Sequence, residues 1–191
     1  MSGADVAEIL KLPPEERFYA GGSNSVRGFG RNELGTDGAS GVYVAERTRV
    51  VPEFAHVSKG YRAVGTPVFV PLGGTAVAVA SAELRLPSPF LRDLLGLAFF
   101  VDAGALSTGT LLDIRVRDLR YTPGAGLRIR TPVGPARIDV AYRPHGPGRA
   151  PLLAPDPLNP DRLIEVERDF APEESGIFRR LQFHLAVGQA F

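Results

Sequence analysis

The chain has 191 residues and carries 22 Lys and Arg against 21 Asp and Glu, so its formal net charge is +1. This balance gives no general attraction to nucleic acid, and the absence of cysteine excludes disulfides, thiolate metal sites and cysteine nucleophiles within these residues. With 22 Gly and 17 Pro, the sequence favours turns over long helices. No run reaches the roughly 18 consecutive apolar residues of a membrane-spanning helix.

The first part of the chain, residues 1–72, is predicted to be mostly irregular. We recognise no signal peptide there, because no basic start is followed by an apolar run. Residues 16–30 are too rich in Gly, Ser and Asn for a regular element, and their glycines permit positive φ angles and close backbone approach. We therefore predict a structured loop, followed by short strands at 41–45 and 67–71.

From residue 75 onward, apolar and polar residues alternate with period two, which predicts strands. The predicted strands cover residues 75–86, 95–105, 122–131, 136–142 and 181–191. One face of each strand is apolar, and the opposite faces carry the charged residues Glu83, Asp102, Arg128, Arg130, Arg137 and Asp139. Short turns follow the first and third of these strands, whereas residues 143–174 contain seven prolines and are interpreted as a long loop.

The strand pattern fits two architectures. A tilted transmembrane strand needs about 9–11 residues, and outer-membrane barrels have short turns on one rim and long loops on the other. A soluble β-sandwich produces the same alternation, because one face is buried and the other is wet. The last strand favours the barrel, since its alternate apolar residues and its aromatic end suit a surface that faces lipid.

Two motifs are specific enough to indicate a family. The first is Val-Arg-Gly-Phe, formed by Val26, Arg27, Gly28 and Phe29. The second is Phe-x-Asp-x-Gly in residues 100–104, which contributes Asp102 and Gly104. Weaker matches lie in residues 74–84, 132–135 and 183–191. In this order, the motifs resemble the C-terminal barrel portion of the bacterial surface antigen family, the BamA/TamA-like outer-membrane assembly factors.

The resemblance implies an all-β fold, the C-terminal part of a 16-stranded transmembrane β-barrel with about five antiparallel strands and an inward-folded sixth loop. Residues 1–191 would form a partial barrel domain. Its lumen loop and an irregular extension would occupy residues 1–72, its last strands residues 73–191, and a long extracellular loop residues 143–176 or so. Because about five strands cannot close a barrel, and open edges leave unpaired backbone groups in lipid, we interpret the sequence as a fragment.

Arg27 and Asp102 are the residues to which the resemblance gives a role. A guanidinium can bind a carboxylate through two parallel hydrogen bonds, and the family architecture implies that the two side chains meet in the barrel lumen. There Arg27 would anchor the loop and set the barrel conformation. Without the resemblance, Arg27 reads as a surface arginine and Asp102 as a residue that ends a strand.

The end of the chain resembles the C-terminal strand signal that barrel substrates present to the assembly machinery. The residues of this signal are Phe183, Leu185, Val187 and Phe191. The last strand would also form one half of the seam at which the first and last strands of a barrel meet.

The function implied by the resemblance is insertion or translocation of other proteins at the bacterial outer membrane, without covalent chemistry, enzymatic activity or cofactor. Nucleophile-elbow, dinucleotide and phosphate-loop motifs are incomplete in this sequence, and its three scattered histidines do not suggest a metal site. Expected partners are outer-membrane lipid, unfolded barrel substrates or exported proteins, and periplasmic accessory lipoproteins, but not nucleic acid.

Three alternatives remain open. A secretion pore of the two-partner type shares the loop and strand motifs. From different classes, a soluble all-β binding module and a non-functional gene remnant are also compatible with the strand pattern. Solubility without detergent would favour the binding module, whereas refolding only in detergent would favour the barrel.

Overall fold

The chain is all-β in the computed structural model. The structure describes residues 12–34, 41–50, 61–89, 91, 93–132, 134–145, 148–159, 161–172 and 176–187. Within these residues, the regular elements are the strands β1 to β11 and a few single-turn 3₁₀ helices. No helix in this part of the chain has the length and apolar character needed to cross a membrane.

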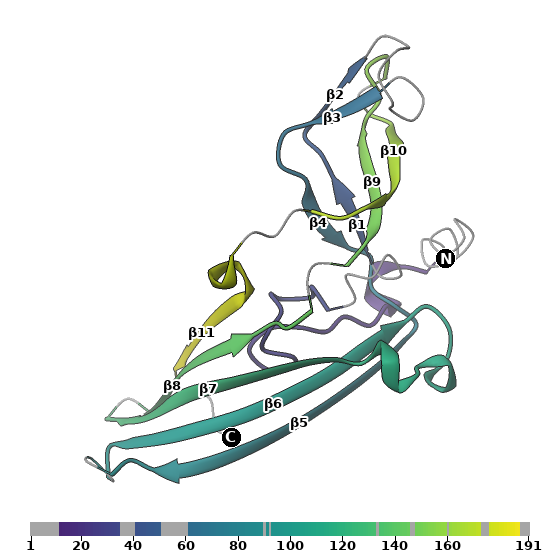
Figure 1. Ribbon diagram of the computed structural model, residues 1–191. Coiled ribbons are helices and arrows are strands. Elements are labelled where there is room, and N and C mark those ends of the chain that lie inside the picture. The colour runs from purple at the N-terminus through teal and green to yellow at the C-terminus, as the bar shows by residue number, and fades with distance from the viewer. Residues whose placement is uncertain are drawn as a thin grey trace.

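The largest element is an antiparallel sheet with the strand order β11-β8-β7-β6-β5 (Figure 1). Its strands are β5 (Ala76–Pro87), β6 (Leu95–Ser107), β7 (Arg120–Thr131), β8 (Gly134–Tyr142) and β11 (Leu181–Val187). These are the five strands predicted from the alternation, with ends shifted by no more than a few residues. The end of the last predicted strand, residues 188–191, lies outside the described residues.

The connections between these strands are short at one end of the sheet and long at the other. Residues 88–94 and 132–133 join neighbouring strands at the first end, whereas residues 108–119 and 143–180 lie at the second. The predicted asymmetry of the two rims is therefore confirmed, and it is the arrangement found in outer-membrane barrels.

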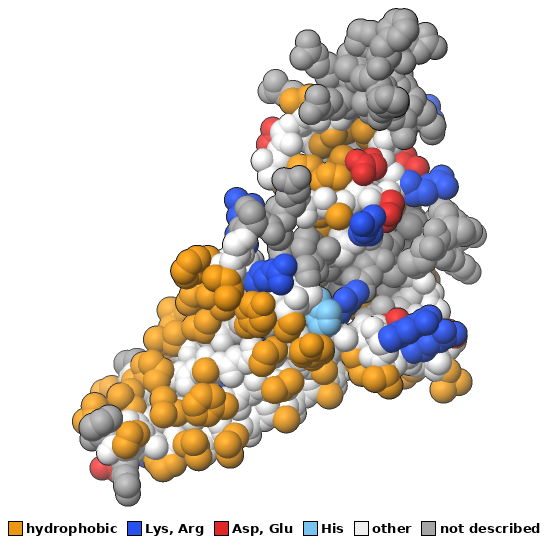
Figure 2. Space-filling view, viewed as in Figure 1, with side chains coloured by type: hydrophobic (Ala, Val, Ile, Leu, Met, Phe, Trp, Pro, Cys, Tyr) orange, Lys and Arg blue, Asp and Glu red, His pale blue; other side chains and the backbone are white. Residues whose placement is uncertain are grey.

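The two faces of the five-stranded sheet differ in polarity, as the alternation predicts. One face exposes large apolar side chains, and Figure 2 shows hydrophobic side chains gathered over this part of the molecule. The exposed residues of this outward face include Leu84, Leu86, Phe99, Val101, Leu127, Ile138, Phe183, Leu185 and Val187. The opposite, inward face carries the charged residues and is covered in part by residues 18–34, which we call the lumen loop.

The lumen loop is compact, although it contains no strand or helix. Its base is closed by a bridge between Phe18 and Gly74, which lies two residues before β5. Gly21 and Gly22 have φ angles of 106° and 101°, which a residue with a side chain rarely adopts. The loop has its own small core, formed by Ala20, Val26, Phe29 and Leu34, with Val77 of β5 packed against it. The predicted structured loop is therefore present.

A second sheet lies beyond the long-connection end of the first, with the order β10-β9-β1-β4 (Figure 1). Its strands are β1 (Gly41–Val44), β4 (Val68–Pro71), β9 (Ala150–Pro155) and β10 (Leu163–Phe170). A hairpin of β2 (Arg47–Val50) and β3 (Tyr61–Val64) extends from β1. The predicted strands at 41–45 and 67–71 correspond to β1 and β4, whereas β2 and β3 were not predicted.

Residues 143–174 were interpreted as a long loop, and the two strands β9 and β10 that lie within them were not predicted. The prolines are placed where a strand tolerates them. Pro151 falls where the register between β9 and β10 shifts, and Pro155 ends β9 opposite Leu163. At a bulge or a strand end, a missing backbone N–H removes no regular hydrogen bond of the sheet.

Candidate functional site

Arg27 of the lumen loop and Asp102 of β6 form a buried, bidentate ion pair. The Arg27 Nε lies 2.7 Å from Asp102 Oδ2 and its Nη2 lies 2.8 Å from Oδ1. The backbone N–H of Arg27 also donates to Asp102 Oδ2 at 3.0 Å. Arg27 is 5% exposed and Asp102 is fully buried. The predicted ion pair is thus confirmed, and it fixes both the side chain and the backbone of the loop.

Other inward-facing side chains complete the environment of this pair. Arg27 Nη1 donates to Glu83 Oε2 of β5 at 2.8 Å, and it lies 3.5 Å from Asp139 Oδ2 of β8. Ser81 donates its hydroxyl to Asp102 Oδ1 at 2.6 Å. The guanidinium carbon lies 3.3 Å from the centre of the Phe100 ring, a cation–π contact. The arginine is therefore held by residues of three different strands.

Arg128 of β7 joins two of these carboxylates into a network. Its Nη2 lies 3.0 Å from Glu83 Oε1, and its Nη1 lies 2.5 Å from Asp139 Oδ1. The centre of the network thus holds Arg27 and Arg128 against Glu83, Asp102 and Asp139, and the side chains of all five are at most 17% exposed. Because charges so far from water are costly when unpaired, loss of one member affects the others.

The charge on Arg27 is secured by its surroundings. Burial opposes the charged form and lowers the pKa of this guanidinium, but the hydrogen bonds that Arg27 donates to Asp102 and Glu83 act in the opposite direction, and so does the charge of Asp139. The net result is a pKa raised above the ordinary arginine value. Arg27 is therefore a cation at neutral pH.

Two motif glycines allow the lumen loop to approach the five-stranded sheet, which we call the wall. A side chain on Gly28 would collide with the methyl group of Thr122 in β7, whereas the Gly28 N–H now donates to the Thr122 hydroxyl at 3.3 Å. A Cβ atom on Gly104 would lie 2.6 Å from a methyl group of Val26. Both glycines of the predicted motifs thus have a steric role where the loop meets the sheet.

The two strands at one edge of the sheet also contact the lumen loop. His184 of β11 places Nε2 2.7 Å from the carbonyl oxygen of Arg27, and Arg137 of β8 donates to the carbonyl of Ser23 at 2.9 Å. The contact of His184 with the loop was not predicted from the sequence. Among the residues of the predicted strand signal, Phe183, Leu185 and Val187 are exposed on the outward face, and Phe191 lies outside the described residues.

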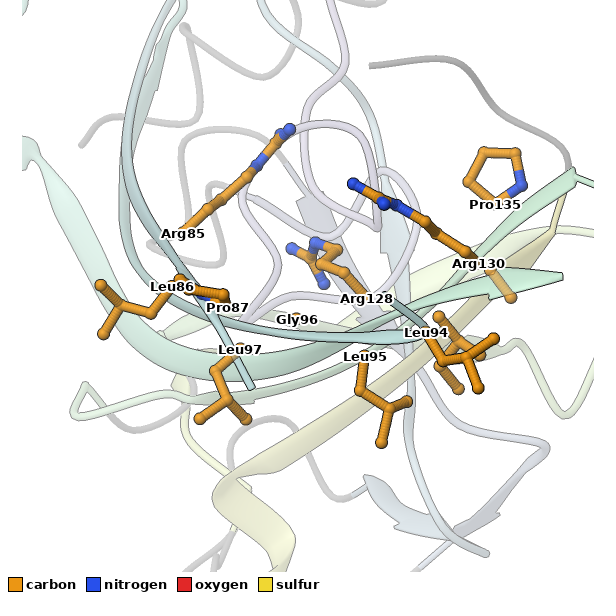
Figure 3. A pocket seen from close by; sticks show the side chains of 12 residues that line it. Arg85, Leu86, Pro87, Leu94, Leu95, Gly96, Leu97, Arg128, Arg130 and Pro135 are labelled. Carbon is orange, nitrogen blue, oxygen red and sulfur yellow. The ribbon is translucent and has the colours of Figure 1, made fainter. Parts of the chain in front are cut away.

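A cavity of about 380 Å³ lies nearer the short-turn end of the wall. Its polar lining comes from Arg85, Arg128 and Arg130, and Figure 3 shows these guanidinium groups on one side of the sheet. Gly96 of β6 also lines the cavity. In the described part of the chain, no group of three or more His, Asp or Glu side chains has an arrangement that could hold a metal ion.

The network includes residues whose partnership was not predicted. The alternation placed Glu83, Arg128 and Asp139 on inward faces, but it gave no cross-strand register. In the sheet, Ser81 pairs with Asp102 and Gly126 pairs with Asp139, which brings these side chains around the loop. The spacing of the charges along each strand was visible in the sequence, whereas their meeting point depends on the relative shift of the strands.

Comparison with known proteins identifies the family to which this chain belongs. Residues 4–191 match the Omp85 superfamily domain. The chain belongs to the Omp85 superfamily. It is 26% identical over 157 residues to the outer membrane protein assembly factor BamA of Neisseria meningitidis serogroup B, an alignment that covers 69% of this chain and 17% of that protein.

The family resemblance inferred from the two motifs is therefore confirmed. The chain spans about a sixth of the length of this curated relative. That relative is an assembly factor of the outer membrane.

Proposed function

We propose that residues 73–191 form the last strands of a 16-stranded outer-membrane barrel and that the lumen loop folds back into its interior. Membership of the Omp85 superfamily supports this proposal, as does the contrast between an exposed apolar face and a charged face covered by the loop. In this arrangement the long connection at about 143–176 is extracellular, and the short turns face the periplasm.

The two edges of the five-stranded sheet are evidence that it is part of a larger barrel. Within the described residues, β5 and β11 each pair with a neighbouring strand on one side only. In lipid, each unpaired backbone group at such an edge costs several kcal/mol. Further strands must therefore pair with both edges in a membrane, and β11 is one half of the seam at which such a barrel closes.

The activity we propose is the insertion or translocation of other proteins without covalent chemistry. The observation that carries the proposal is the buried network around Arg27, because it ties the lumen loop to β5, β6 and β8 and so controls the shape of the wall. The substrates would be unfolded barrel proteins or exported proteins, with outer-membrane lipid and periplasmic lipoproteins as partners. The relative named as an assembly factor supports the first class of substrate.

The test uses the full-length protein in lipid vesicles. Arg27→Ala should reduce the assembly of an unfolded barrel substrate at least about tenfold, because a buried ion pair loses one partner, and Arg27→Lys should restore part of the activity. Arg149→Ala, which removes an exposed ion pair with Asp169, is the control. Wild-type folding and wild-type assembly by Arg27→Ala would contradict the proposal. A second arm with an exported substrate separates insertion from secretion.

A further inference from the structure

Two insertions, far apart in the sequence, share one sheet. The first insertion is residues 41–71, between the lumen loop and β5, and the second is residues 148–170, between β8 and β11. They meet through the parallel pair of β1 and β9, in which Val44 lies opposite Leu153. The N–H of Ala45 also donates to the Leu153 carbonyl at 2.9 Å. The insertions are therefore joined by backbone hydrogen bonds as well as by side chains.

Tyr43 is the centre of the contact between the insertions. Its ring packs edge-on against Phe69 of the first insertion, with centroids 5.4 Å apart, and against Phe170 of the second, with centroids 5.3 Å apart. Its hydroxyl donates to the carbonyl of Gly148 at 3.2 Å. Tyr43 is 4% exposed and belongs to a buried cluster with side chains from both insertions. Aromatic pairs of this geometry stabilise a contact beyond the area they bury.

The first insertion, residues 41–71, follows the lumen loop in the chain after residues 35–40. The loop and the insertion lie between the two ends of the bridge from Phe18 to Gly74, so they form one closed segment. This segment is held at two separate places. Arg27 binds the inward face of the five-stranded sheet, and β1 binds β9 of the second insertion.

We propose that the sheet shared by the two insertions is a second anchor of the lumen loop and that Tyr43 is its positioning residue. Two linked contacts reinforce each other. When one contact opens, the other still holds the loop close to the sheet, so the opened contact can form again. Loss of the Arg27 network alone therefore leaves the loop close to the wall. The loop leaves the lumen only when both anchors fail. This inference concerns loop retention and does not depend on the proposed assembly activity.

The first experiment measures hydrogen exchange of residues 20–34 in the full-length protein, in Arg27→Ala, Tyr43→Ala and the double variant. Exchange in the double variant should be at least about tenfold faster than in Arg27→Ala. Tyr43→Phe keeps both ring contacts and should remain near wild type. If Tyr43→Ala accelerates exchange only within the two insertions, and adds nothing to the effect of Arg27→Ala on the loop, the inference is wrong.

A disulfide tests the same anchor without weakening the protein, since the described chain contains no cysteine of its own. Val44→Cys with Leu153→Cys links the two insertions, whereas the matched control, Val44→Cys with Val68→Cys, links two strands of the first insertion. In the Arg27→Ala background, oxidation of the first pair should return loop exchange to within about threefold of wild type. Oxidation of the control pair should not.

Equal protection by both disulfides, or by neither, would overturn the inference. Failure of the first pair to form in the wild-type background would also overturn it, because β1 and β9 would then not be paired. Assembly of a barrel substrate is measured in parallel on the wild-type protein. If that activity is absent while the first disulfide still restores loop protection, the proposed function is wrong and the second anchor stands.

Discussion

Neutralising Arg27 should cost more stability than neutralising Asp102, although the two form one ion pair. At the centre of the network, Arg27 and Arg128 contact three carboxylates, two of which have a further arginine nearby: Arg85 lies 2.8 Å from Glu83 and Arg137 lies 3.9 Å from Asp139. Asp102 has Arg27 as its one ion-pair partner among the described residues. Arg27→Gln leaves the buried Asp102 without its cation, whereas Asp102→Asn keeps one carbonyl oxygen as an acceptor and leaves Arg27 in contact with Glu83 and Asp139. The first change therefore leaves a buried charge unpaired, and the second does not.

The expected magnitudes follow from the burial of these groups. Breaking a buried ion pair by removing one partner costs about 3–5 kcal/mol, which we expect for Arg27→Gln because Asp102 is fully buried. For Asp102→Asn we expect about 1–3 kcal/mol, the cost of imperfect hydrogen bonds without a surplus charge. The double variant should lose less stability than the sum of the single variants, because no buried charge of the pair is left unpaired.

The assay is urea unfolding of the full-length protein in lipid vesicles, followed by the gel mobility of folded and unfolded forms. Arg149→Gln is the control, since its ion pair with Asp169 is 68% exposed on both sides and should contribute less than about 1 kcal/mol. Additive losses in the double variant, or a larger loss for Asp102→Asn than for Arg27→Gln, would refute the reasoning that Arg27 is the cation that pairs the buried Asp102.

Three further changes test other contacts of the wall. Gly104→Ala should displace the lumen loop and cost about 1–3 kcal/mol in the same unfolding assay, whereas Gly96→Ala on the same strand meets only ordinary contacts, the nearest at 3.5 Å, and should cost clearly less. His184→Ala should cost about 0.5–1.5 kcal/mol through the lost hydrogen bond to Arg27, and His184→Gln should recover part of it if the donor is what matters. Phe99→Arg, at a half-exposed position of the outward face, should lower the folding yield into vesicles and cost up to about 2–4 kcal/mol; an unchanged yield would contradict a lipid-facing surface.

The five strands of the wall could be predicted because each of them shows the alternation locally. A strand with one apolar and one polar face repeats every second residue, so the sequence of β6 alone indicates both its extent and its faces. The turns added further information, since Pro87 and Pro135 mark the short-turn end of the sheet. Neither signal depends on which strands become neighbours.

The second sheet could not be predicted as a whole because its stability comes from a distant partner. β1 and β4 were recognised, but β9 pairs with β1 in parallel across more than a hundred residues of sequence, and β9 carries two prolines that usually argue against a central strand. Packing around Tyr43 and a bulge at Pro151 make the strand possible. Neither feature has a local signature.

The site was predicted in part for a related reason. Arg27 and Asp102 stood out as residue types suited to a bidentate pair within recognisable motifs. Glu83 and Asp139 were placed on inward faces, but each lies on a different strand, and a shift of one residue between strands would turn a side chain outward. Only the observed register shows that these carboxylates share the two arginines.

The two attachments of the lumen loop differ in their physical character, and this difference affects how each can open. The Arg27 network consists of buried charges, which must regain water or new partners together when they separate. The sheet around Tyr43 consists of backbone hydrogen bonds and apolar contacts, which local unfolding of a short strand pair can open gradually. A loop held by both can therefore loosen at its outer part while Arg27 remains in place. Opening in the reverse order would expose buried charge first, so the outer sheet is the part that opens first when the loop begins to leave the lumen.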